Sequence, residues 1–105
     1  MSNWLDVSNI DELTLSTRRV VDVEGINVAV FNLGGEYFAI KDECPHDGGV
    51  LSNGELDGEV IICPRHGARF SIRTGTVLGP PAYEDLITFP VRISQGKVQV
   101  EIDRT

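Results

Sequence analysis

The strongest constraint on how this 105-residue chain folds comes from two short segments, C-P-H at 44–46 and C-P-R-H at 63–66, which contain all of its cysteines and histidines. Thiolate sulfur and imidazole nitrogen bind zinc, iron and iron–sulfur clusters far better than calcium or magnesium, which prefer oxygen ligands. The fold must therefore bring two segments that lie 16 residues apart to one metal centre. The predicted ligands are Cys44, His46, Cys63 and His66.

The mixed composition of each segment narrows the choice of metal. A structural zinc site of the Cys2His2 type normally pairs cysteine with cysteine, and histidine with histidine, at short spacing. Here each segment has one of each, which favours a [2Fe-2S] cluster with both cysteines on one iron and both histidines on the other. Two alternatives remain open. One is a structural zinc module that binds other proteins, and the other is a Cys44–Cys63 disulfide, which leaves both histidines without a role.

This pattern resembles the Rieske iron–sulfur family, whose signature is a C-x-H and a C-x2-H segment at about this interval. The resemblance extends to Gly48-Gly49, to Gly67, and to the G-P-P run at 79–81, which looks like the proline loop that covers the cluster. In size the chain is most similar to the soluble ferredoxin components of ring-hydroxylating oxygenase systems. The resemblance implies one Rieske-type [2Fe-2S] cluster held by the two cysteines and two histidines.

The same resemblance implies a function. We expect an electron carrier, not an enzyme, which takes single electrons from a flavin-dependent ferredoxin reductase and passes them to a terminal oxygenase. No histidine is left over for the mononuclear iron site that an oxygenase needs. The alternative within the family is a small Rieske-like subunit of a larger redox enzyme, such as an NADH-dependent nitrite reductase.

The residues after the last ligand predict a low reduction potential. Two ferric ions, two sulfides, two thiolates and two neutral imidazoles sum to zero charge, and a neutral cluster accepts an electron more easily than a negatively charged one. Rieske centres therefore have reduction potentials of roughly −150 to +300 mV, against about −400 mV for all-cysteine plant-type clusters. High-potential relatives resemble one another in placing Ser and Tyr hydroxyls where this chain has Ala68 and Phe70. Because hydrogen bonds to cluster sulfurs raise the potential, we expect a value near the low end. High-potential relatives also carry an extra cysteine pair that ties the loops together, which this chain lacks.

The net charge of −7 predicts an acidic surface. A dispersed negative surface disfavours nucleic acid and favours fast, salt-sensitive docking onto basic patches. We interpret Asp42, Glu43 and Asp47, beside the predicted ligands, as surface acids that contact a partner. There is neither a secretory signal nor an apolar run of membrane-spanning length, so we expect a cytoplasmic monomer that binds no membrane.

Alternating β-branched and polar residues predict an all-β fold, an antiparallel β sandwich or barrel. We expect a single Rieske domain over 1–105, with a cluster-binding subdomain of about 42–82 inserted in a base of 1–41 and 83–105. Glycine pairs predict hairpin turns, and residues 9–13 are expected to form one short helical turn. The predicted strands are 17–24, 26–33, 37–41, 60–63, 69–73, 86–92 and 97–102, and the predicted turns are Gly34-Gly35, Thr74-Gly75 and Gln95-Gly96.

Overall fold

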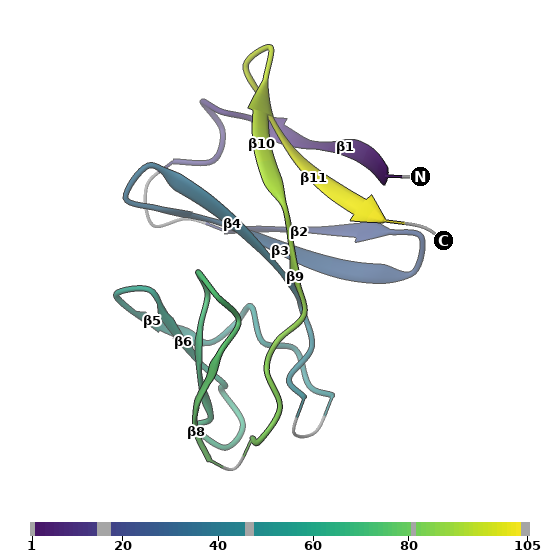
Figure 1. Cartoon of the computed structure of the whole chain (residues 1–105). Coiled ribbons are helices and arrows are strands. Elements are labelled where there is room, and N and C mark those ends of the chain that lie inside the picture. Colours follow the sequence, from purple (N-terminus) through teal and green to yellow (C-terminus); the bar gives the residue numbers. More distant parts are fainter. Residues whose placement is uncertain (1, 15–17, 46–47, 81, 104–105) are drawn as a thin grey trace.

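The computed structural model describes residues 2–14, 18–45, 48–80 and 82–103, which form eleven strands and no helix (Figure 1). The strands make three antiparallel sheets, ordered β1-β11-β10, β2-β3-β4-β9 and β5-β6-β7-β8. The all-β prediction is confirmed. Within the described ranges there is accordingly no helix that could cross a membrane.

The strand bounds agree with most of the predicted ranges. They are β1 (Ser2–Asn9), β2 (Arg18–Val23), β3 (Ile26–Leu33), β4 (Glu36–Lys41), β5 (Glu55–Asp57), β6 (Val60–Ile62), β7 (Arg69–Ser71), β8 (Val77–Gly79), β9 (Thr88–Phe89), β10 (Val91–Ser94) and β11 (Lys97–Asp103). Three strands were not predicted. Of these, β5 and β8 have only three residues each, and the pairing of β1 with β11 shifts register between Asp6 and Ser8, which interrupts the alternation that sequence reading depends on.

The hairpin turns lie where the glycines predict them. Gly34 and Gly35 have φ of 64° and 92°, and Gln95 and Gly96 have φ of 51° and 76°. Positive φ at both central residues is what a two-residue type I′ turn requires, and glycine adopts it without steric cost. Gly75, with φ of 79°, lies in the turn between β7 and β8.

One predicted strand, residues 86–92, is wrong because it is two strands. β9 pairs with β4 in the second sheet, whereas β10 pairs with β11 in the first. Pro90 separates them, and it has no N–H to donate to a ladder. The chain therefore crosses from one sheet to the other at the proline.

The predicted helical turn at 9–13 is present only as a single hydrogen-bonded turn. Asn9 ends β1, and the chain then makes a turn in which the N–H of Glu12 donates to the carbonyl of Asn9 at 3.0 Å. The side chain of Asn9 donates in return to the carboxylate of Glu12 at 2.6 Å. These two bonds complete a single turn, so no helix starts.

Two apolar clusters divide the interior. One lies between the first two sheets and includes Val28, Val30, Val98 and Val100. The other joins the second sheet to the third, which lies below it in Figure 1, away from both termini. Since β5 to β8 are consecutive strands between β4 and β9, this second cluster packs a continuous stretch of chain against the remainder.

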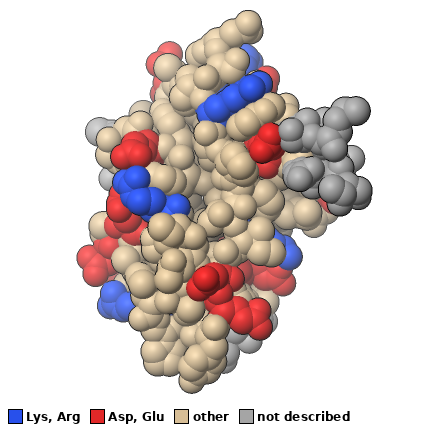
Figure 2. All heavy atoms as spheres, viewed as in Figure 1, with Lys and Arg blue, Asp and Glu red and all other residues tan. Residues whose placement is uncertain are grey.

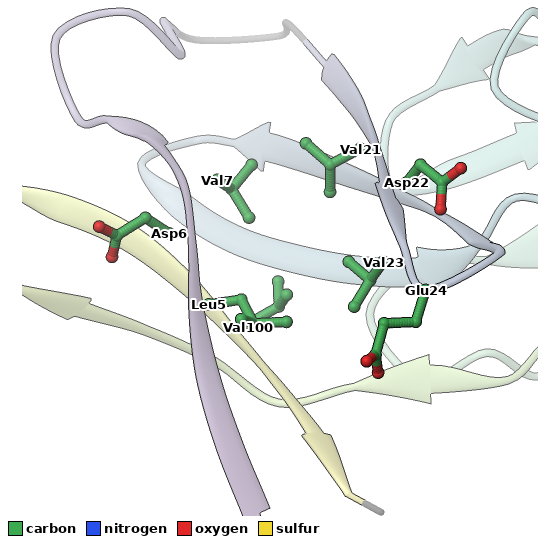
Figure 3. A pocket seen from close by; sticks show the side chains of 8 residues that line it. All are labelled: Leu5, Asp6, Val7, Val21, Asp22, Val23, Glu24 and Val100. Carbon is green, nitrogen blue, oxygen red and sulfur yellow. The ribbon is translucent and has the colours of Figure 1, made fainter.

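The first and second sheets are not paired with each other at their edge strands, β1 and β2. A groove of about 260 Å³ lies between these two edge strands, with Val7, Val23 and Val100 among its lining (Figure 3). Asp6 and Glu24 also line it. Charges and a bulge on edge strands oppose pairing with another chain, and none of the predicted metal ligands lines this groove.

An ion-pair cluster on the surface ties the third sheet to the second. Arg73, which follows β7, donates to Glu36 at the start of β4 at 3.1 Å and to Glu59 in the β5–β6 turn. Its guanidinium lies 4.7 Å from the centre of the Phe38 ring. The hydrogen bond from Arg73 lowers the pKa of Glu59, and bonds to both carboxylates raise the pKa of Arg73.

Candidate metal centre

The two cysteines of the predicted ligand set are buried and are not joined in a disulfide. Cys44 follows β4, and Cys63 follows β6. The two residues are 1% and 2% exposed, and neither is part of a disulfide. The disulfide alternative is therefore not what the structure contains.

The first cysteine loop is closed by two backbone hydrogen bonds. The carbonyl of Cys44 accepts from the N–H of Gly48 at 2.8 Å, and the N–H of Cys44 donates to the carbonyl of Gly49 at 2.9 Å. Gly48 has φ of 75°, a conformation that side-chain-bearing residues rarely adopt. The backbone of this loop therefore favours a glycine at position 48.

The second cysteine loop repeats this arrangement. The carbonyl of Cys63 accepts from the N–H of Gly67 at 3.0 Å, and the N–H of Cys63 donates to the carbonyl of Ala68 at 2.7 Å. Gly67 has φ of 79°. In both loops the cysteine carbonyl thus bonds the glycine four residues later, and the cysteine N–H bonds the carbonyl five residues later. We call this shared pattern the cysteine-loop frame.

Both thiols belong to the apolar cluster that joins the second and third sheets. Ala68 and Phe70, whose missing hydroxyls predict a low potential, are members of the same cluster and are fully buried. Phe70 therefore also fills the core, as large aromatic side chains do in general. The low potential itself stays a prediction.

The histidines are placed differently from the cysteines. His66 is exposed, while His46 and Asp47 lie outside the described residues. Within the described ranges, no three His, Cys, Asp or Glu side chains converge to hold one metal ion. A [2Fe-2S] cluster with two protein ligands on each iron needs no such triad, and two buried thiols with an exposed imidazole match its donor set.

The structure corrects the interpretation of Asp42 as a surface acid. The residue is 8% exposed, and its side chain accepts hydrogen bonds from the backbone of Leu51 and from Ser52. Sequence reasoning missed this role because the two partners lie nine and ten residues away. Glu43, in contrast, is exposed and pairs with Lys41 at 2.8 Å.

The predicted proline loop begins beside the second cysteine loop. Gly79, the last residue of β8, pairs with Arg69, the first residue of β7. Pro80 is exposed, and Pro81 lies outside the described residues. The start of this run is therefore close in the sheet to the end of the Cys63 loop.

Acidic residues surround the first cysteine without forming one continuous patch. A groove beside Cys44 is lined by Glu43, Glu84 and Asp85, together with Lys41. Figure 2 shows Asp and Glu side chains interspersed with Lys and Arg over the visible face of the molecule. The predicted dispersed negative surface agrees with this view.

Comparisons with known proteins identify the family. A model of the Rieske [2Fe-2S] domain matches residues 3–90. The biphenyl dioxygenase ferredoxin subunit of Pseudomonas sp. (strain KKS102) is 39% identical over 97 residues, which cover 91% of this chain and 89% of that protein.

Solved structures of similar proteins agree with this family assignment. The ferredoxin of Sphingomonas yanoikuyae B1 superimposes with a TM-score of 0.87 at 31% identity, covering 96% of this chain and all of that one. A chain in a complex of reduced oxygenase and oxidised ferredoxin of carbazole 1,9a-dioxygenase gives a TM-score of 0.88 at 37% identity, covering 92% and 91% of the two chains. With the soft-ligand set and the two matching cysteine loops, these similarities show that the chain belongs to the Rieske [2Fe-2S] family, as a ferredoxin that carries a Rieske-type cluster.

Proposed function

We propose that Cys44 and Cys63 bind one iron of the cluster and that His46 and His66 bind the other. The observation that most supports this assignment is the pair of buried cysteines, not joined in a disulfide, in loops with the same cysteine-loop frame. Equivalent backbone frames present two equivalent ligands, as one iron with two thiolates requires. Zinc or a disulfide gives no reason for this pairing of a cysteine with a histidine in each loop.

The residues around the site determine where an electron enters and leaves. When bound, the cluster supplies reversible one-electron chemistry. Both cysteines are buried in an apolar cluster, whereas His66 is exposed, so a partner approaches closest on the histidine side. We infer that electrons pass through the ring of His46 or His66.

The partners follow from this arrangement and from the relatives. We infer that a flavin-dependent ferredoxin reductase supplies single electrons and that a terminal oxygenase receives them. A similar ferredoxin has been solved with an oxygenase in carbazole 1,9a-dioxygenase, which supports the second half of this proposal. The chain acts as a carrier and not as an enzyme, because its only two histidines are assigned to the cluster.

We also propose where and in what form the protein acts. It is a cytoplasmic monomer in which residues of about 42–82 form the cluster-binding subdomain on a base of 1–41 and 83–105. The acids beside Cys44, which include Glu43, Glu84 and Asp85, are suited to basic side chains on either partner. Association should then slow as ionic strength rises, because salt screens such charges.

The proposal is tested by metal analysis and by transfer kinetics. We expect two irons and two acid-labile sulfides per chain, and stopped-flow electron transfer that slows with salt. Glu43→Gln should weaken the salt dependence, whereas Glu55→Gln, an exposed acid on β5, should leave it unchanged. A colourless protein loaded with zinc would overturn the ligand assignment, and stable co-purification in a larger enzyme would overturn the role as a free carrier.

A further inference from the structure

The two cysteine loops share a frame but are closed differently at their bases. The Cys63 loop joins β6 to β7, and the strand pair Ile62–Arg69 brackets it. The Cys44 loop leaves the end of β4 and runs into the 51–54 turn before β5 begins. No strand pair brackets this first loop among the described ladders, so a contact beyond its two internal backbone bonds must hold the chain together at its base, between residues 42 and 51.

The side chain of Asp42 occupies the position where such a bracket is needed. Its Oδ1 accepts from the N–H groups of Leu51 at 3.0 Å and Ser52 at 2.6 Å, and its Oδ2 accepts from the Ser52 hydroxyl at 2.7 Å. The backbone N–H of Asp42 donates to Asn27 at 2.8 Å, which fixes it to β3. A buried carboxylate is costly unless it is hydrogen-bonded, and these three donors compensate it.

Arg18 holds the same segment from the other side. Its Nη1 donates to the carbonyls of Ser52 at 2.6 Å and Gly54 at 2.7 Å. The guanidinium lies 5.5 Å from the centre of the Phe31 ring, a side chain that is fully buried. The 51–54 turn is therefore bonded through both its N–H and its C=O groups to residues of β2 and the end of β4.

Gly54 links this turn to the second loop. A Cβ at Gly54 would lie 2.0 Å from the carbonyl oxygen of Ile62 and 3.2 Å from that of Leu51. The backbone of the turn thus packs directly against the residue that precedes Cys63. Through the turn, Asp42 is connected to the bases of both cysteine loops.

We propose that Asp42 is a positioning residue, which with Ser52 and Arg18 closes the first cysteine loop and fixes it relative to the second. The network performs noncovalently what an additional cysteine pair would do covalently. The proposal rests on the proposed function in one respect, namely that both loops hold the same cluster. It predicts that breaking the network disturbs the cluster itself and not merely the stability of the fold.

The test compares Asp42→Ala with Asp42→Asn in the cluster-loaded protein. The asparagine oxygen still accepts from the two backbone N–H groups, whereas alanine leaves these buried donors without a partner. Hydrogen bonds to a charged group are among the stronger ones in a folded protein, so we expect Asp42→Ala to lose its cluster to a chelator at least about tenfold faster than wild type. Its reduced EPR signal should broaden, and Asp42→Asn should restore most of both properties.

Two further variants keep the test decisive if Asp42→Ala does not fold. Ser52→Ala removes one hydroxyl bond, and Arg18→Met removes both guanidinium bonds, so each should speed cluster loss by a smaller factor. Glu55→Gln, which removes a negative charge from β5, should change nothing. Wild-type cluster loss and EPR in Ser52→Ala, Arg18→Met and every folded Asp42 variant would overturn the proposal, as would equal damage from Asp42→Ala and Asp42→Asn.

A separate readout distinguishes this proposal from the ligand assignment. Hydrogen exchange of segment 48–56, followed by mass spectrometry, should be faster in Asp42→Ala and Ser52→Ala than in wild type. If the wild-type EPR signal is not that of a Rieske centre, the ligand assignment fails whatever the variants do. If that signal is as expected but exchange in the segment is unchanged by the variants, the positioning role of Asp42 fails alone.

Discussion

The two cysteine loops reach the same backbone frame by different routes. The second is the loop of a β-hairpin, so the ladder between β6 and β7 brings its ends together. The first has no such ladder within the part of the chain that the structure describes, and it depends on a buried carboxylate that bonds residues nine and ten positions later. A hairpin is a local structure, whereas the first loop requires β2, β3 and the 51–54 turn to be in place.

This difference suggests that the two loops of the metal centre form at different stages of folding. The second loop is formed by neighbouring residues and can present Cys63 as soon as its hairpin exists. The first loop presents Cys44 only within the folded protein. The comparison can be tested by changing equivalent positions in the two loops.

The largest expected effect is that of the ligands themselves. Cys44→Ala and Cys63→Ala should each abolish the bound cluster, because the remaining thiolate cannot hold the iron alone. The amount of bound cluster in each variant is measured by iron and sulfide analysis together with the visible spectrum. Ile61→Val, which trims a buried neighbour at a cost of about 1 kcal/mol, is the packing control and should keep the cluster. A cluster retained at full occupancy without either cysteine would contradict the assignment.

Alanine substitutions at three glycines should rank in a definite order. Gly48 and Gly67 both have positive φ, and an added Cβ meets nothing closer than 3.6 Å at Gly48 and nothing within 4 Å at Gly67. Backbone strain of about 1–2 kcal/mol should therefore cost the two loops equally. Gly54→Ala should cost about 3 kcal/mol or more, because the methyl meets backbone at 2.0 Å.

The measurement for the three glycines is the apparent melting temperature, followed by loss of visible absorption. Gly54→Ala should melt lowest, and the variants at 48 and 67 should melt together between it and wild type. A clear difference between the last two would show that the cysteine-loop frame is not equivalent in the two loops.

A smaller effect is expected on the reduction potential. Ala68→Ser, alone or with Phe70→Tyr, should raise it by offering hydroxyl donors to the cluster sulfurs. A bond about 1.4 kcal/mol stronger to the reduced state corresponds to roughly 59 mV for one electron. Ala82→Ser, another buried alanine of the same apolar cluster, should leave the potential unchanged. Protein-film voltammetry measures these midpoint potentials. A wild-type midpoint among those of the high-potential members would contradict the predicted low potential.

The smallest effect should come from Arg73, which ties the second loop's sheet to β4. Arg73→Met removes both ion pairs and should lower the melting temperature slightly at low salt and not at high salt. Because the pKa of Glu59 is lowered, this contribution is present above its ordinary value of 4.5 and is lost as the pH falls through the lowered value. A salt-independent loss would assign the effect to packing on Phe38 instead.

Much of this architecture could be predicted from local sequence. The ligand spacing predicted the two loops, and glycines predicted the turns, because positive φ and hairpin geometry depend on one or two residues. Pro90 also carried a local signal, since a proline cannot donate within a ladder, and it marks the crossing that the predicted strand 86–92 overlooked. Short or bulged strands such as β5 and β1 were missed because three residues, or a shifted register, leave no clear alternation.

The role of Asp42 could not be predicted in this way. An aspartate before a ligand, in a chain of net charge −7, reads as one more surface acid. Its burial depends on how the 51–54 turn packs against β2 and β6, which is a tertiary property. The hairpin loop was thus predictable, and the closure of the other loop was not.

Mössbauer spectroscopy of the ⁵⁷Fe-loaded protein tests the central claim most directly. If two thiolates bind one iron and two imidazoles bind the other, the oxidised protein should show two quadrupole doublets of equal area with different isomer shifts. On reduction, one site should become ferrous while the other stays ferric. A single doublet from equivalent irons, or the absence of a coupled pair, would contradict the account.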